Sequence, residues 1–138
     1  MNFGNSPEKV KRVMPSRSRA SSMFTSSADA IATAKLIPLN THTSKSILRE
    51  LYEGLREYCE GIGYIHGLKF RNHESIGLFI KDFLEESALS GKFDRYRKLR
   101  NGINYLGNDV DMETVKWALL EIPQMITGLK KHTIEGFK

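Results

Sequence analysis

Apolar residues recur every three or four positions over most of this chain, the spacing at which side chains share one face of an α-helix. The clearest run follows the capping candidates Thr41, Thr43 and Ser44 and comprises Ile47, Leu48, Leu51, Leu55, Tyr58, Cys59 and Ile62. Charged residues fill most of the positions between them. This run predicts a long amphipathic helix that faces a core.

Two weaker runs flank this helix. From Ser16 onward one face carries Phe24, Ala28, Ile31 and Lys35, with Met23, Ser27 and Ala34 beside it. The small residues of this run permit close helix approach, and Pro38 ends it. After the central helix, glycines 61, 63 and 67 are expected to loosen the chain. Asn72 is then expected to cap a third helix that ends at Ser90 and Gly91 and carries Ile76, Phe79, Ile80, Phe83 and Leu84.

A fourth helix is expected to end at Gly107, and a fifth begins at Asp109 or Asp111. The fifth carries Val115, Leu119, Ile122, Ile126 and Leu129 around Trp117, with Pro123 marking a kink or a boundary. No segment alternates in the way that requires a strand. The pattern therefore predicts an all-α protein, an up-and-down bundle of four to five helices.

Charge divides the chain unevenly. The net charge is +5 over 138 residues, yet residues 1–20 hold five basic side chains against one acidic side chain, and so do residues 92–100. Residues 1–15 are interpreted as a basic, flexible leader, and residues 16–138 as one helical domain. Two concentrated basic segments favour a polyanionic partner such as RNA or a nucleotide.

The fourth helix places its basic and apolar residues on different faces. One stripe holds Tyr96, Leu99, Ile103 and Leu106, which are expected to pack. The opposite arc is expected to contact a ligand, and with Lys98 it gives the candidate nucleic-acid-binding residues: Arg97, Lys98, Arg100, Asn101, Asn104 and Tyr105.

The sequence lacks the residue patterns that several other kinds of site require. The single cysteine, Cys59, rules out an intrachain disulfide and reads as a buried apolar group. The histidines, His42, His66, His73 and His132, are too scattered to predict a metal site. The sequence also has no phosphate-binding glycine loop, so no nucleotide cofactor is predicted. No apolar run approaches the ~20 residues needed to span a bilayer, so we expect a cytoplasmic protein with no membrane partner.

The fourth helix resembles the motif of the HEPN domain family, small α-helical bundles found in prokaryotic toxins and defence proteins and in some eukaryotic proteins. The resemblance lies in Arg100-Asn101-Gly102-Ile103-Asn104-Tyr105. This segment is similar to the family pattern of an arginine, a polar residue, a short spacer and a histidine. The order of the helices around it agrees, and the resemblance covers Ser16 to the C-terminus.

The resemblance implies a homodimer whose two motif helices face each other, with Arg100 of each chain near the two-fold axis. In active family members such a dimer forms a metal-independent ribonuclease site. Carried over to this chain, the catalytic positions are Arg100, Asn101 and Tyr105, where Tyr105 stands in place of the histidine. A tyrosine with a pKa of about 10 is a poor proton acceptor near neutrality, which favours binding over cleavage.

Three functions follow from this resemblance. The first is an RNA- or nucleotide-binding module with weak or absent cleavage, and the second is a metal-independent endoribonuclease toxin. The third is a protein-interaction module paired with a small nucleotidyltransferase, as in toxin-antitoxin systems.

Overall fold

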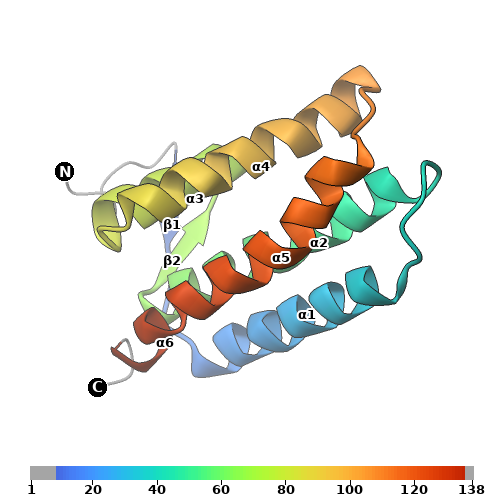
Figure 1. The fold of residues 1–138 in the computed structure, drawn as a ribbon. Coiled ribbons are helices and arrows are strands. Elements are labelled where there is room, and N and C mark those ends of the chain that lie inside the picture. The colour runs from blue at the N-terminus through green and yellow to red at the C-terminus, as the bar shows by residue number, and fades with distance from the viewer. Residues whose placement is uncertain (1–8, 136–138) are drawn as a thin grey trace.

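The computed structural model describes residues 9–135, and helices make up most of it (Figure 1). The long helices run in alternating directions along the bundle: α1 (Arg17–Leu36), α2 (Ser44–Ile65), α4 (Ser87–Leu106) and α5 (Met112–Leu129). Shorter elements are α3 (His73–Leu78), the π-helical turn η2 (Phe79–Phe83), α6 (Lys131–Glu135) and the strands β1 (Val10–Arg12) and β2 (Leu68–Phe70). The predicted all-α class is confirmed at this level.

The central helix of the bundle is α2, which packs against α1, α4, α5 and β2. All of its predicted core residues are buried: Ile47, Leu48, Leu51, Leu55, Tyr58, Cys59 and Ile62. In Figure 1, α1 and α4 lie on opposite sides of the bundle, with α2 and α5 between them. The strongest periodicity in the sequence therefore marks the helix around which the others assemble.

The face of α1 that packs on α2 agrees with the predicted one except at Ala28 and Lys35. Its buried residues are Ala20, Ser27, Ala30 and Ala34, whereas Ala28 and Lys35 are exposed. Ser27 Oγ donates a hydrogen bond to the carbonyl of Gly54 at 2.6 Å. Small side chains let the two backbones approach this closely. The predicted Phe24 and Ile31 also pack against α2, where they lie beside Gly61 and Gly54.

The glycines near the end of α2 do not loosen the chain, which remains helical to Ile65. A Cβ atom at Gly61 would lie 2.5 Å from the ring of Phe24, and one at Gly63 would lie 2.8 Å from the ring of Phe70. These glycines make room for aromatic rings that pack against the helix. The expectation of a break there was wrong because packing compensates for the low helix propensity of glycine.

The third helix begins as predicted, since Asn72 Oδ1 accepts a hydrogen bond from the Ser75 N–H at 2.8 Å. It continues as η2 and ends before Glu85, whose φ of 59° lies in the left-handed region. The predicted end at Ser90 and Gly91 is therefore wrong, because both residues lie inside α4. The fifth helix continues through Pro123, so no boundary lies there.

The two strands were not predicted. They pair antiparallel with Val10 opposite Phe70, and Val10, Leu68 and Phe70 are buried. Strands of three residues are too short to show the alternation by which strands are recognised in a sequence. Part of the proposed leader, residues 9–15, thus contains β1, whereas residues 1–8 of that leader lie outside the described residues.

Candidate functional site

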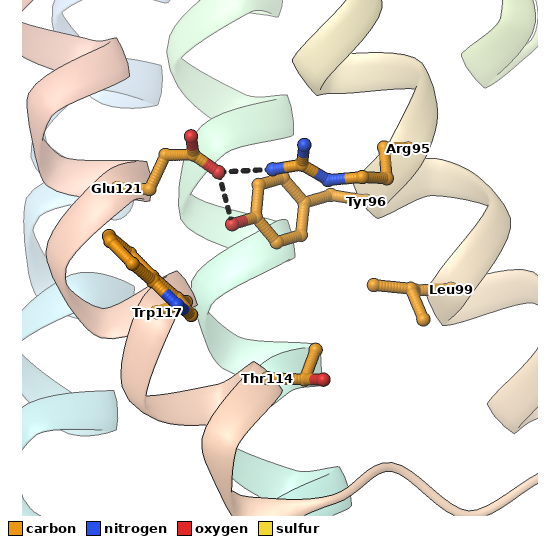
Figure 2. A pocket seen from close by; sticks show the side chains of 6 residues that line it. All are labelled: Arg95, Tyr96, Leu99, Thr114, Trp117 and Glu121. Atoms are coloured by element: carbon orange, nitrogen blue, oxygen red, sulfur yellow. Dashed lines mark hydrogen bonds and ion pairs between the residues drawn. The ribbon is translucent and has the colours of Figure 1, made fainter.

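A polar contact between α4 and α5 fixes the orientation of α4 (Figure 2). Tyr96 is buried and its hydroxyl donates a hydrogen bond to Glu121 Oε1 at 2.6 Å, and Arg95 pairs with the same carboxylate. Burial alone would raise the pKa of Glu121, but the Tyr96 hydrogen bond and the charges of Arg95 and Lys92 hold this pKa below its ordinary value. A cavity of about 490 Å³ surrounds this contact.

A second cavity, of about 430 Å³, lies on the other flank of α4, where α3 begins. We call it the α3–α4 pocket, and it is lined by Asn72, His73, Glu74, Arg97, Arg100, Asn101 and Tyr105. It brings together most of the predicted binding residues. Lys98 and Asn104 do not line it: Lys98 is exposed, and Asn104 Oδ1 accepts a hydrogen bond from Arg49 Nε at 2.7 Å.

Arg100 is half-buried and lies at the floor of this pocket. Its guanidinium carbon is 5.3 Å from the ring centroid of the fully buried Tyr52, within the range of a cation–π contact. Its Nη1 donates a hydrogen bond to Asn101 Oδ1 at 3.1 Å. Among the described side chains of residues 9–133, Arg100 forms no ion pair with a carboxylate. Its positive charge is therefore held in place without being neutralised.

Arg97 and Leu106 depart from the predicted division of α4 into two faces. The Arg97 side chain is only 15% exposed, because its Nε donates a hydrogen bond to Asp94 Oδ1 on the same helix at 3.0 Å. Leu106 was expected to pack but is 76% exposed. It is the last residue of α4, where the helix reaches the end of the bundle (Figure 1). The site thus occupies the flank of α4 that faces α3, rather than its outer side.

His73 belongs to the pocket although it was not predicted as a site residue. Its Nδ1 lies 3.0 Å from the hydroxyl oxygen of Tyr52. Burial, followed by the nearby charge of Arg100, lowers the pKa of His73 to about 4, so the ring is neutral near pH 7. Burial raises the pKa of Tyr52, which keeps its phenol protonated. We assign the phenol as donor to Nδ1, which leaves the imidazole proton on Nε2.

The hydrogen bonds already made leave the pocket rich in donors. Asn101 Oδ1 accepts from Arg100 and Asn72 Oδ1 accepts from Ser75, so the side-chain NH₂ groups of both asparagines remain to donate. His73 Nε2 and the guanidinium of Arg100 add further donors. Glu74 is the one carboxylate in the lining. Such an arrangement suits an anionic group with several oxygen atoms.

His73, Asn72 and Tyr52 were missed as site residues for a physical reason. The sequence identified Asn72 as a helix cap and Tyr52 had no indicated role, while His73 stood alone among scattered histidines. These residues meet Arg100 only because α3 and α4 both pack against α2. The one local signal was the position of His73 directly after the cap residue, which fixes the ring at the start of a helix.

Lowering the pH from about 7 to 4 should destabilise the fold through His73. The pKa of His73 is lowered to about 4 in the folded state from an ordinary value of 6.5. The unfolded chain therefore binds more protons across this range, and the free energy of unfolding decreases as the pH is lowered. We expect the free energy of unfolding to fall by about 2 kcal/mol, a value that already allows for the partial exposure of the ring. Thermal unfolding of the wild type and of His73→Gln measures it: equal pH dependence in both proteins would contradict this role of His73.

Within the described part of the chain, no three or more histidine, cysteine or acidic side chains gather in a way that could hold a metal ion. No helix over residues 9–135 combines the length and apolar character that crossing a membrane requires. Comparison with protein-family models, with curated proteins and with solved structures found no match to this chain.

Proposed function

We propose that this chain is a HEPN-like RNA- or nucleotide-binding module whose α3–α4 pocket holds a phosphate group. The observation that carries the proposal is the unneutralised guanidinium of Arg100, placed among side-chain donors in a cavity of about 430 Å³. Arginine binds phosphate oxygens through paired, charge-assisted hydrogen bonds. Glu74 supplies an acceptor that suits a ribose 2′-hydroxyl, which favours RNA over DNA.

The pocket favours binding over cleavage. His73 supplies an imidazole that the motif lacks at Tyr105, and this is the observation in favour of a ribonuclease. However, general acid–base catalysis works best when the pKa of the group lies near the working pH, and the pKa of His73 is lowered to about 4. A neutral imidazole with so low a pKa donates a hydrogen bond well but removes a proton poorly. Cleavage therefore remains the second candidate.

A homodimer is part of the same proposal. Tyr105 and Leu106 are 73% and 76% exposed near the end of α4, so a second copy would cover apolar surface there. Pairing of the two α4 helices would also bring two α3–α4 pockets to one side of the assembly. Sedimentation of the wild type and of Leu106→Asp reports this contact. The nucleotidyltransferase partner stays a prediction of the resemblance alone.

Replacing Arg100 by glutamine should weaken RNA binding about 10-fold or more, because a charge-assisted contact to phosphate is lost. Each phosphate contact to a single strand contributes about 0.7 to the slope of log affinity against log salt, so this slope should fall by about that amount. Fluorescence anisotropy of a labelled single-stranded RNA, measured over a series of salt concentrations, gives both quantities.

The matched control is Arg95→Gln, which removes the same charge from the opposite flank of α4. Arg95 is paired with Glu121 and does not line the α3–α4 pocket. Equal losses in the two variants would show that RNA responds only to net charge, and this would reject the pocket as the binding site. Circular dichroism of each variant confirms that the fold is retained.

A further inference from the structure

The solvent face of the β1–β2 ribbon carries only basic side chains. Because Val10, Leu68 and Phe70 are buried, the alternation of side chains along a strand sends their neighbours to the opposite face. We call this opposite face the ribbon face, and it comprises Lys9, Lys11, Lys69 and Arg71.

The pairing register places these like charges next to one another. Lys11 lies directly opposite Lys69, and Arg71 donates its backbone N–H to the carbonyl of Lys9 at 2.9 Å. Like charges opposite each other on paired strands repel and destabilise the pairing. A ribbon of two three-residue strands is only marginally stable, and these four basic residues lower its stability further. Their presence therefore indicates a role other than stabilising the fold.

No carboxylate among the described side chains, those of residues 9–133, forms an ion pair with any of the four. The charge of Lys69 reaches Glu60, but that carboxylate is paired with Arg56 on α2. A third cation lies beside Lys11 and Lys69: with Arg19 they line a cavity of about 450 Å³. The ribbon face is therefore a concentrated positive surface with a hollow beside it.

We infer that the ribbon face and this hollow form a second phosphate-binding site, for the same RNA strand that enters the α3–α4 pocket. The inference rests on the proposed function for the identity of the strand, while the site itself rests on different residues. Arg71 is followed directly by Asn72 and His73, which line the pocket. Four residues span at most about 14 Å, so Lys69 and His73 lie within reach of one short stretch of RNA.

Double replacement of Lys11 and Lys69 by glutamine tests this site. Binding of a labelled single-stranded RNA long enough to reach both sites should weaken about 10-fold at low salt, and the salt slope should fall by about 1.4, the contribution of two phosphate contacts. Binding of a nucleoside 5′-monophosphate to the pocket, followed through the His73 imidazole signal, should stay unchanged because one nucleotide cannot span both sites. The control is the double variant Lys35→Gln and Lys130→Gln, which removes two exposed cations from a groove between α1 and α5. Equal weakening in both double variants would overturn the inference.

A charge reversal separates binding from folding. Lys11→Glu replaces repulsion across the ribbon by attraction to Lys69, so its melting temperature should rise while its affinity for the long RNA falls. Loss of binding in a more stable protein cannot come from unfolding. If Lys11→Glu binds the long RNA as tightly as the wild type, the ribbon face is not a binding site.

The same experiments distinguish this inference from the proposed function. If Arg100→Gln has a lower affinity for RNA and the ribbon variants do not, the pocket binds RNA and the second site is overturned. If the ribbon variants have a lower affinity for RNA and Arg100→Gln does not, the ribbon site stands and the pocket proposal fails. Vesicles containing phosphatidylserine serve as the other anionic probe. Ribbon-dependent binding to vesicles, without ribbon-dependent binding to RNA, would overturn the inference in favour of a membrane surface.

Discussion

Phe79→Ala is expected to lower the free energy of unfolding by about 4 kcal/mol, the cost of emptying a well-packed aromatic site. Phe79 is fully buried, and its ring centroid lies 5.1 Å from that of Phe70 on β2 and 5.0 Å from that of Phe83. The ring joins the ribbon to the α3–η2 segment, so its loss leaves a cavity between the two. Chemical denaturation followed by circular dichroism measures the difference.

The neighbouring ring provides the control. Phe83 stacks on Phe79 but is 44% exposed, so Phe83→Ala removes less buried surface and should cost only about 1 kcal/mol. Similar losses in the two variants would mean that Phe79 does not hold the ribbon and α3 together. Because the ring packs against β2 and lies on the segment that continues from α3, partial destabilisation should also weaken RNA binding at raised temperature.

Gly67→Ala should destabilise the protein by about 3 kcal/mol. Its φ of +71° costs a residue with a side chain about 1 kcal/mol, and the new Cβ would lie 2.7 Å from the carbonyl oxygen of Val13. That oxygen belongs to the backbone and cannot rotate away, so the clash adds about 2 kcal/mol. Thermal or chemical unfolding of the purified variant gives the value.

Gly107 separates the two contributions. It has nearly the same φ, +69°, yet a Cβ placed there meets nothing within 4 Å. Gly107→Ala should therefore cost about 1 kcal/mol, the conformational part alone. If both alanine variants lose the same stability, the close contact between Gly67 and the segment before α1 does not contribute as described.

Regular helical periodicity predicted the parts of the fold in which one broad face is buried. All seven predicted core residues of α2 are buried, and Gly107 ends α4 in the left-handed conformation. Periodicity also predicted the packing of Phe24 and Ile31 in α1, but it placed the exposed Ala28 and Lys35 on the same face. Periodicity did not predict β1, because the burial of Val10 depends on a partner strand far along the chain.

The candidate site could be predicted only as far as it lies on one helix. Arg97, Arg100, Asn101 and Tyr105 follow from the spacing along α4, and the pocket includes all of them. His73 comes from another helix, and no local pattern connects it with Arg100. The ribbon face could be recognised only from the strand register, because neither the basic residues near β1 nor those near β2 form an unusual pattern in the sequence.

The most direct test of phosphate binding in the α3–α4 pocket is nuclear magnetic resonance of side chains during titration with a trinucleotide RNA. We expect the side-chain amide of Asn101 and the imidazole of His73 to shift together and to saturate with one dissociation constant. The amide of Asn104, which is bonded to Arg49 outside the pocket, should shift much less. A trinucleotide that binds while leaving Asn101 and His73 unchanged, or that does not bind at all, would contradict the account.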